Sequence, residues 1–246
     1  VTYAPNGKLV PVDPNGTPIP GADTPTYPTD PNDPTKVVPN EPIPDVPGYT
    51  PVDPSPVTPT DPGKDTPVPY VQVVTGTIKY VDDTTGKTLS SSDLPSGKVG
   101  SKINYTTADK IKSYEDQGYE LVSNDFTDGS QVYEKVGNDF VVHLKHKTQT
   151  ITPNDPNQVT PGQPINPNDP NSPVYPTDAD RNNLVKNATQ TIHYVGAGDH
   201  TPVDNTVTQK DAFTRTVTID KAPRRLTRLT RHSLTGTMPT RRLPVD

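Results

Sequence analysis

Two histidines three residues apart, His143 and His146, form the spacing in this 246-residue sequence that most invites a metal-binding interpretation. Imidazole nitrogens are common zinc ligands. The segment "DFVVHLKHK" around them alternates apolar and polar residues, which is typical of a strand. Residues i and i+3 of a strand point to opposite faces, so the two rings cannot bind one ion without a bulge. We therefore expect no metal site and expect both histidines at a solvated strand end.

Aspartates in Asp-Pro-Asn-type runs supply oxygen ligands of the kind that calcium prefers. They are Asp30, Asp33, Asp155 and Asp169. The EF-hand pattern, with its glutamate at the twelfth position, is missing from the sequence. Turns spaced by proline explain the same pattern without an ion. Turns are the simpler interpretation, and the sequence leaves calcium dependence open.

The motifs of common enzyme classes are missing from the sequence. It has no nucleophile elbow, P-loop or dinucleotide-binding glycine pattern, and "GAGDH" at 196–200 reads as a turn. The lack of cysteine excludes disulfides and thiol chemistry. The sequence predicts a protein that is not an enzyme and that carries no cofactor.

Tyrosine is the residue type with the most promising binding chemistry, since the chain has eleven tyrosines against three phenylalanines. Tyrosine joins an apolar ring face to a hydroxyl group, which suits stacking on sugars and contacts at wet interfaces. The candidates for ligand binding are Tyr114, Tyr119 and Tyr133. The alternative is that each is a half-buried residue of a sheet or a helix.

The distribution of proline indicates which parts of the chain can position such residues. Twenty of the 33 prolines lie in residues 1–69, one lies in 70–148 and eight lie in 149–180. Proline fixes φ and removes a backbone donor, which favours extended, polyproline-like segments. Apolar residues in these segments are too sparse to build a core by themselves. We predict a folded domain between two proline-rich spacers.

Residues 70–148 show the patterns of strands and one helix. "TGTIKYVDDTTGKTL" predicts two strands around a turn, and "TADKIKSYEDQGYEL" predicts a helix that begins after Thr107 and stops at Gly118. Strand patterns return in "YELVS" and in "SQVYEKVGNDFVVHLKHK", where Phe140, Val142 and Leu144 share one face. This order predicts an α+β domain with one helix packed on a mixed sheet.

Charge and hydropathy indicate whether the chain binds nucleic acid or enters a membrane. Residues 1–220 carry a net charge of −12, which argues against nucleic acid, whereas residues 221–246 carry +6. The sequence has no apolar run long enough to span a bilayer, so we expect no membrane insertion. We expect a monomer.

Several segments together resemble the mucus-binding (Mub) repeats of surface adhesins of lactic acid bacteria. "GTIKYVDDTTGKTL", "SGKVGSKINYTT", "GYELVSNDF" and "GNDFVVHLKHKTQTI" resemble the second half of one repeat. "NATQTIHYVGAGDHTPVDNTVTQKDAFTRTVTIDK" resembles the opening of the next repeat, and "VTYAPNGKLVPVDPNGTPIPGADTPTYPTDPNDP" resembles the end of a preceding half-repeat. The segments cover residues 1 to about 221 in the order of the family.

The resemblance implies a β-grasp, ubiquitin-like fold for each half-repeat. It also implies an extracellular protein attached to the Gram-positive cell wall that binds mucin glycoproteins through many weak module contacts. Some family members bind immunoglobulins, which gives one alternative. A structural stalk without a host ligand is the other alternative.

The chain departs from the family after "TVTIDK", where an arginine-rich sequence replaces the further strands of the module. Half a β-grasp fold cannot pair its edge strands, so we predict poor order from about residue 184. The predicted parts are the end of a half-repeat (1–16), a spacer (17–69), a β-grasp-like module (70–148), a second spacer (149–183), an incomplete half-repeat (184–221) and a disordered basic tail (222–246).

Overall fold

The computed structural model describes residues 4–222 and 230–231. Strands dominate, and helices are few, which agrees with the predicted α+β class. The contacts between residues divide the chain into two compact units. Unit 1 comprises Val1–Val81, Thr88–Thr107 and Asn124–Val142, and unit 2 comprises Asp82–Lys87, Ala108–Ser123 and His143–Asp246.

In the described part of the chain, the elements follow one another as short strands with two helices and one 3-10 turn. They are β1 (Leu9–Val12), β2 (Thr29–Asp30), β3 (Asp33–Val37), β4 (Tyr49–Pro51), β5 (Thr66–Val74), β6 (Thr77–Asp82), β7 (Lys87–Asp93), β8 (Gly97–Lys98), α1 (Ala108–Asp116), β9 (Tyr119–Asn124), β10 (Asp139–His146), β11 (Thr148–Ile151), α2 (Arg181–Leu184), β12 (Val185–Ile192), η1 (Gly198–His200), β13 (Asn205–Thr214), β14 (Val217–Asp220) and β15 (Thr230–Arg231).

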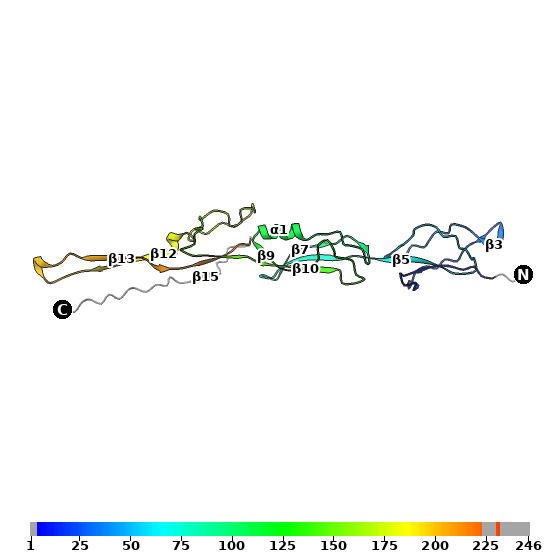
Figure 1. Cartoon of the computed structure of the whole chain (residues 1–246), viewed down its shortest axis with the longest axis horizontal. Coiled ribbons are helices and arrows are strands. Elements are labelled where there is room, and N and C mark those ends of the chain that lie inside the picture. Colours follow the sequence, from blue (N-terminus) through cyan, green and yellow to red (C-terminus); the bar gives the residue numbers. More distant parts are fainter. Residues whose placement is uncertain (1–3, 223–229, 232–246) are drawn as a thin grey trace. The chain divides into compact units, whose positions relative to one another are not determined.

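The N-terminal part of unit 1 has a core of its own. β5, cyan in Figure 1, pairs in parallel with β1 and antiparallel with β4. A buried apolar cluster lies around these strands, and its members are Leu9, Ile19, Tyr27, Val37, Val46, Val68 and Tyr70. The prediction that residues 17–69 form a spacer without a core is therefore wrong, because the sparse apolar side chains converge on one cluster.

Aspartate side chains fold this proline-rich segment back on itself. Asp13, Asp30, Asp33, Asp53 and Asp61 each accept a hydrogen bond from the backbone N–H two residues further on. Proline has no N–H and cannot donate the backbone hydrogen bond of a turn. In these Asx turns the aspartate side chain accepts a hydrogen bond instead, which reverses the direction of the chain. The segment is thus a chain of short extended pieces and turns.

The alternating patterns of the middle segment are confirmed. β7, β6, β10 and β9 form a sheet in that order. Phe140, Val142 and Leu144 of β10 are buried, as are Ile78 and Tyr80 of β6. The predicted helix is α1, and Gly118 follows it with a φ of 91°, a value that favours glycine.

Gly97 of β8 packs directly against the ring of Tyr133 within unit 1. A Cβ atom at position 97 would lie 2.2 Å from Cε2 of Tyr133, which is itself buried. We expect Gly97→Ala to lower the free energy of unfolding by about 1–3 kcal/mol, because overpacking forces neighbours apart. Thermal or urea unfolding measures this loss. Gly63→Ala is the control, since its nearest neighbour would lie 3.5 Å away, and an equal loss in both variants would contradict the prediction.

The second proline-rich segment also contributes to a core. In unit 2, β11 pairs antiparallel with β14, which also pairs with β15. The buried cluster beside them contains Ile151, Ile165, Ala179, Leu184, Val217 and Ile219. The predicted spacer at 149–183 supplies three of these side chains, so the expectation of a coreless segment is wrong here too.

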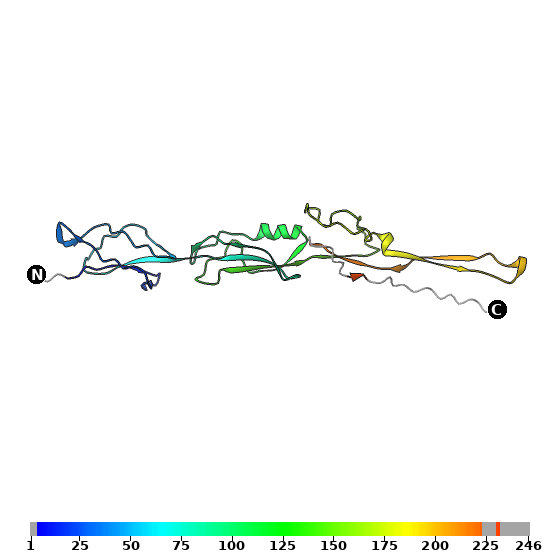
Figure 2. The same ribbon diagram turned by 180° about the vertical axis from the view of Figure 1, so that it is seen from behind.

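Residues 184–222 contain the strands β12, β13 and β14, contrary to the predicted poor order. β12 and β13 pair antiparallel from Val185–Thr214 to Ile192–Asn205, and Figures 1 and 2 show them as a long two-stranded ribbon. The ribbon is largely exposed on both faces. β14 finds a partner in β11, upstream in the chain, which the prediction did not consider. The predicted tail at 222–246 lies outside the described residues, apart from Ala222 and the backbone of β15.

Candidate functional site

The three tyrosines predicted as ligand contacts are buried. Tyr114, Tyr119 and Tyr133 expose 8%, 6% and 2% of their surface. The ring of Tyr119 packs edge-on against Tyr114 at a centroid distance of 5.8 Å, and burial raises the pKa of Tyr133. Their placement agrees with the packing alternative that the sequence left open, because little of each side chain is exposed for contact with a ligand.

A groove in unit 1 presents a different tyrosine, and we call it the Tyr105 groove. It encloses about 820 Å³. Its lining consists of Lys102, Ile103, Asn104, Tyr105, Thr106, Asp128 and Gly129. The Tyr105 ring is half-buried, and its hydroxyl group lies 3.0 Å from that of Tyr80. The ring also packs edge-on against Phe126, so the contacts beneath the groove fix its orientation.

The carboxylate of Asp128 is occupied by the loop that forms the groove. It accepts hydrogen bonds from the backbone N–H and the hydroxyl of Thr107 and from the hydroxyl of Thr106, at 2.8–3.0 Å. Thr107 also receives a hydrogen bond from the Asn124 amide. Because Asp128 accepts these hydrogen bonds from its own loop, we consider the exposed side chains of Lys102 and Asn104 as the polar groups that contact a ligand in the groove.

The Tyr105 groove combines features that suit a sugar. A sugar ring has apolar C–H faces and polar hydroxyl groups, and an aromatic side chain beside amide and ammonium donors matches both. The sequence did not single out Tyr105, because "KINYTT" reads only as an extended segment. Only its contacts with Tyr80 and Phe126 show that the ring is held at a surface groove.

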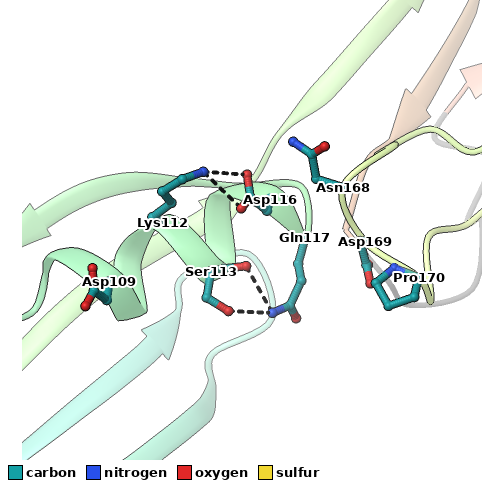
Figure 3. Close-up of a pocket in the computed structure, with 8 residues that line it drawn as sticks. All are labelled: Asp109, Lys112, Ser113, Asp116, Gln117, Asn168, Asp169 and Pro170. Atoms are coloured by element: carbon teal, nitrogen blue, oxygen red, sulfur yellow. Dashed lines mark hydrogen bonds and ion pairs between the residues drawn. The ribbon is translucent and has the colours of Figure 1, made fainter.

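A smaller groove lies in unit 2 between α1 and the loop at 168–170, and Figure 3 shows its lining. It encloses about 310 Å³. Lys112 is paired with Asp116 at 3.0 Å, and Gln117 donates to the backbone carbonyl of Ser113. These polar groups of α1 are paired within the helix, and the lining has no aromatic ring. This α1 groove therefore fits a sugar less well than the Tyr105 groove.

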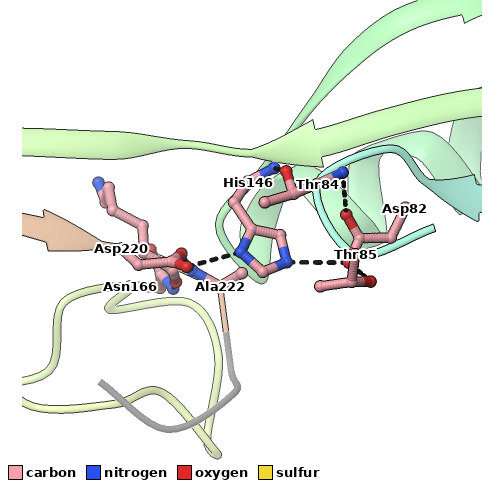
Figure 4. Close-up of polar contacts among 8 residues, drawn as sticks. Asp82, Thr84, Thr85, His146, Asn166, Asp220 and Ala222 are labelled. Atoms are coloured by element: carbon pink, nitrogen blue, oxygen red, sulfur yellow. Dashed lines mark hydrogen bonds and ion pairs between the residues drawn. The ribbon is translucent and has the colours of Figure 1, made fainter. Parts of the chain in front are cut away.

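The two histidines of the H-x-x-H spacing have different surroundings in unit 2. His143 is partly exposed, and its Nδ1 lies 2.7 Å from Oδ1 of Asp83. The side chain of His146 is buried, which corrects the prediction of a solvated strand end for this residue. Its two ring nitrogens contact Asp82 and Asp220 separately, as Figure 4 shows, so they do not converge on one point.

The aspartates considered as calcium ligands form turns. Asp30, Asp33, Asp155 and Asp169 each accept a hydrogen bond from the backbone N–H two residues further on, at 2.8–3.0 Å. Across residues 4–222 and the strand β15, no group of three His, Asp or Glu side chains is placed to hold a metal ion. Within the same described part, no helix has the length and apolarity needed to cross a membrane.

Two regions of the chain match known protein families. Residues 74–146 match the mucin binding domain family, and residues 179–239 match the Muc B2-like domain family. The crystal structure of Mub-RV is 30% identical to this chain and covers 66% of this chain and 72% of its own, with a TM-score of 0.45. The type 2 repeat of the mucus binding protein MUB from Lactobacillus reuteri is 23% identical to this chain. The match covers 68% of this chain and 82% of that repeat, with a TM-score of 0.35. No curated protein sequence matches the chain.

Proposed function

The chain belongs to the mucus-binding repeats of the Mub type, and from this premise we propose that it is a non-enzymatic adhesion module that binds mucin glycans. The match of residues 74–146 to mucin binding domains is the observation that carries the proposal. The Tyr105 groove lies within this segment, and we assign the glycan contact to it. The module acts outside the cell, at the surface of a Gram-positive bacterium.

In adhesion of this kind, several linked modules each bind a sugar weakly at the same time. The groove is open, and it offers one half-buried ring with a few exposed polar groups, which supports weak binding to one sugar. Linked modules raise the effective concentration of the next contact, so that a chain of them adheres far more strongly than one. We further propose that residues 70–148 have a β-grasp fold and that residues 184–221 begin a second half-repeat.

The exposed polar side chains of the Tyr105 groove provide the test. We expect the double variant Lys102→Ala, Asn104→Ala to bind immobilised mucin about five- to thirtyfold more weakly than the unaltered chain, because each lost hydrogen bond costs about 1 kcal/mol. Both side chains are exposed, so folding should be unaffected. Asn168→Ala, in the α1 groove, is the matched control and should bind normally. Surface plasmon resonance on intact and deglycosylated mucin measures the effect.

The same experiment distinguishes the alternatives. Binding that survives complete removal of the sugars would contradict a glycan contact. A chain that binds no mucin in any format would indicate a structural stalk. Binding of immunoglobulin without binding of mucin would favour the immunoglobulin alternative. If mucin binding depends on the glycans but the double variant binds normally, the function stands and the assignment of the groove is wrong.

A further inference from the structure

His146 lies between two carboxylates in unit 2. Its Nδ1 is 2.6 Å from Oδ2 of Asp220, and its Nε2 is 2.9 Å from Oδ2 of Asp82. The His146, Asp82 and Asp220 side chains expose 7%, 3% and 8% of their surface. Figure 4 shows the ring bridging the two acids, with β6 and β14 supplying the acids and β10 the histidine.

This geometry favours a proton on each ring nitrogen. An ionised carboxylate can only accept hydrogen bonds, whereas a neutral imidazole has one N–H and one bare nitrogen. Two ionised carboxylates, one at each ring nitrogen, therefore require two N–H groups. A ring with an N–H on each nitrogen satisfies both carboxylates, whereas a neutral ring would place a lone pair against a carboxylate oxygen.

Other donors hold both carboxylates in place. Oδ1 of Asp82 accepts from the N–H of Thr84 at 2.9 Å, and Oδ2 accepts from the hydroxyl of Thr85. Oδ1 of Asp220 accepts from the N–H of Ala222 at 2.9 Å. Since these bonds fix the acids, neither can turn away when the ring loses a proton. Loss of the ring proton would therefore weaken the contact between the His146 ring and one of the two carboxylates.

The remaining titratable groups near the ring belong to several elements. The Tyr119 ring of β9 packs edge-on against His146 at a centroid distance of 5.3 Å. Lys147 and Lys221 adjoin the triad in sequence, and burial, followed by the positive charge of Lys147, lowers the pKa of Lys221. On β10 and β9, His143 pairs with Asp83, and Lys145 pairs with Glu120. Lys79 of β6 and Asp139 of β10 also carry charge, and Asp139 accepts a hydrogen bond from the Thr77 hydroxyl.

The triad joins the two segments that match different families. Asp82 and His146 belong to the 74–146 segment, and Asp220 belongs to the 179–239 segment. A backbone hydrogen bond also connects the two segments. The N–H of Lys221 donates to the carbonyl of Lys147 at 2.8 Å. Gly118 lies so close that a Cβ there would be 2.1 Å from the carbonyl oxygen of Lys221.

We propose that His146 is an acid-closed clasp, which fixes β14 to the end of β10 while the ring is protonated and loosens this junction when the proton is lost. Because loss of the ring proton leaves a lone pair facing one of the carboxylates, the junction should be stiffer at acidic pH than at alkaline pH. The clasp requires no ligand and stands independently of the proposed adhesion.

Nuclear magnetic resonance and amide hydrogen exchange on the full chain test the clasp. At pH 5.5 the His146 ring should show two N–H groups. Between pH 5.5 and 8.5 the protection factors of the β14 amides, corrected for intrinsic exchange, should fall about ten- to a hundredfold, in step with loss of the ring proton. A neutral ring at pH 5.5, or β14 protection that does not change with pH, would overturn the proposal.

Two variants separate the clasp from general pH effects. In Asp220→Asn the amide can either accept from an N–H or donate to a bare nitrogen, so the pH dependence of β14 protection should largely disappear. His143→Gln is the matched control on the same strand and should retain it. A pH dependence that persists in Asp220→Asn or disappears in His143→Gln would refute the assignment to His146.

Discussion

Tyr70→Ala is expected to unfold the proline-rich part of unit 1. The Tyr70 side chain is almost fully buried in the cluster of Leu9, Tyr27 and Val68, and its hydroxyl group donates a hydrogen bond to the carbonyl of Pro44. Replacing a large buried aromatic side chain with alanine costs about 3–5 kcal/mol. A core of this size supplies only a few kcal/mol in total, so the loss should exceed what the segment can tolerate.

Limited proteolysis with mass spectrometry measures this effect, because folded segments resist cleavage. In the unaltered chain residues 4–70 should survive a brief digestion, and in Tyr70→Ala they should be cut rapidly. Val52→Ala is the matched control in the same segment, since this side chain is 61% exposed. Rapid cleavage of residues 17–69 in the unaltered chain would contradict the folded core and restore the interpretation of a flexible spacer.

In the proline-rich segments, composition alone predicted an extended chain without a core, and this prediction was wrong. Twenty prolines in residues 1–69 suggest an extended chain, and that inference assumes that sparse apolar residues stay apart. Here Asx turns bring Tyr27, Val46 and Tyr70 into one cluster, although the sequence separates them widely. The aspartates that make these turns are visible in the sequence. The convergence of the apolar residues is a tertiary property that no local pattern contains.

Local periodicity predicted the middle segment well. The alternation of Phe140, Val142 and Leu144 places these side chains on one face of a strand, and all three are buried. The helix pattern correctly located α1, since a period near 3.6 differs clearly from the period of a strand. The same reasoning could not find the partner of β14, because β11 lies 66 or more residues upstream of it.

The candidate site depends on contacts between distant residues. Asp128 lies 21 residues from Thr107, yet its carboxylate orders the loop that carries Tyr105. His146 lies 64 residues from Asp82 and 74 from Asp220. The H-x-x-H spacing drew attention to His146, but it contains no information on the two carboxylates that contact the ring. A strand position predicts the face on which a side chain lies, but it does not predict which charges will meet that side chain.

Asp82→Ala should destabilise unit 2 strongly, since it leaves the buried His146 side chain with one carboxylate partner instead of two. Removing one partner of a buried ion pair costs about 3–5 kcal/mol, whereas Asp82→Asn should cost less because the amide still accepts a hydrogen bond from Nε2. Urea unfolding at pH 6 measures both losses. Asp83→Ala, which affects the exposed His143 pair, is the control and should cost less than about 1 kcal/mol.

The acid side of the stability profile tests the same carboxylate. Burial alone would raise the pKa of Asp82, but the hydroxyl of Thr85, the charge and hydrogen bond of His146 and the N–H of Thr84 together lower it below its ordinary value of 3.8. A carboxyl group with a lowered pKa in the folded state stabilises the protein fully above its ordinary pKa, and this stability is lost as the pH falls through the lower folded-state value. The difference in free energy of unfolding between the unaltered chain and Asp82→Asn should therefore be constant from pH 5 to 6 and shrink below pH 4. A difference that grows as the pH falls would show that the triad does not hold Asp82 in its ionised form.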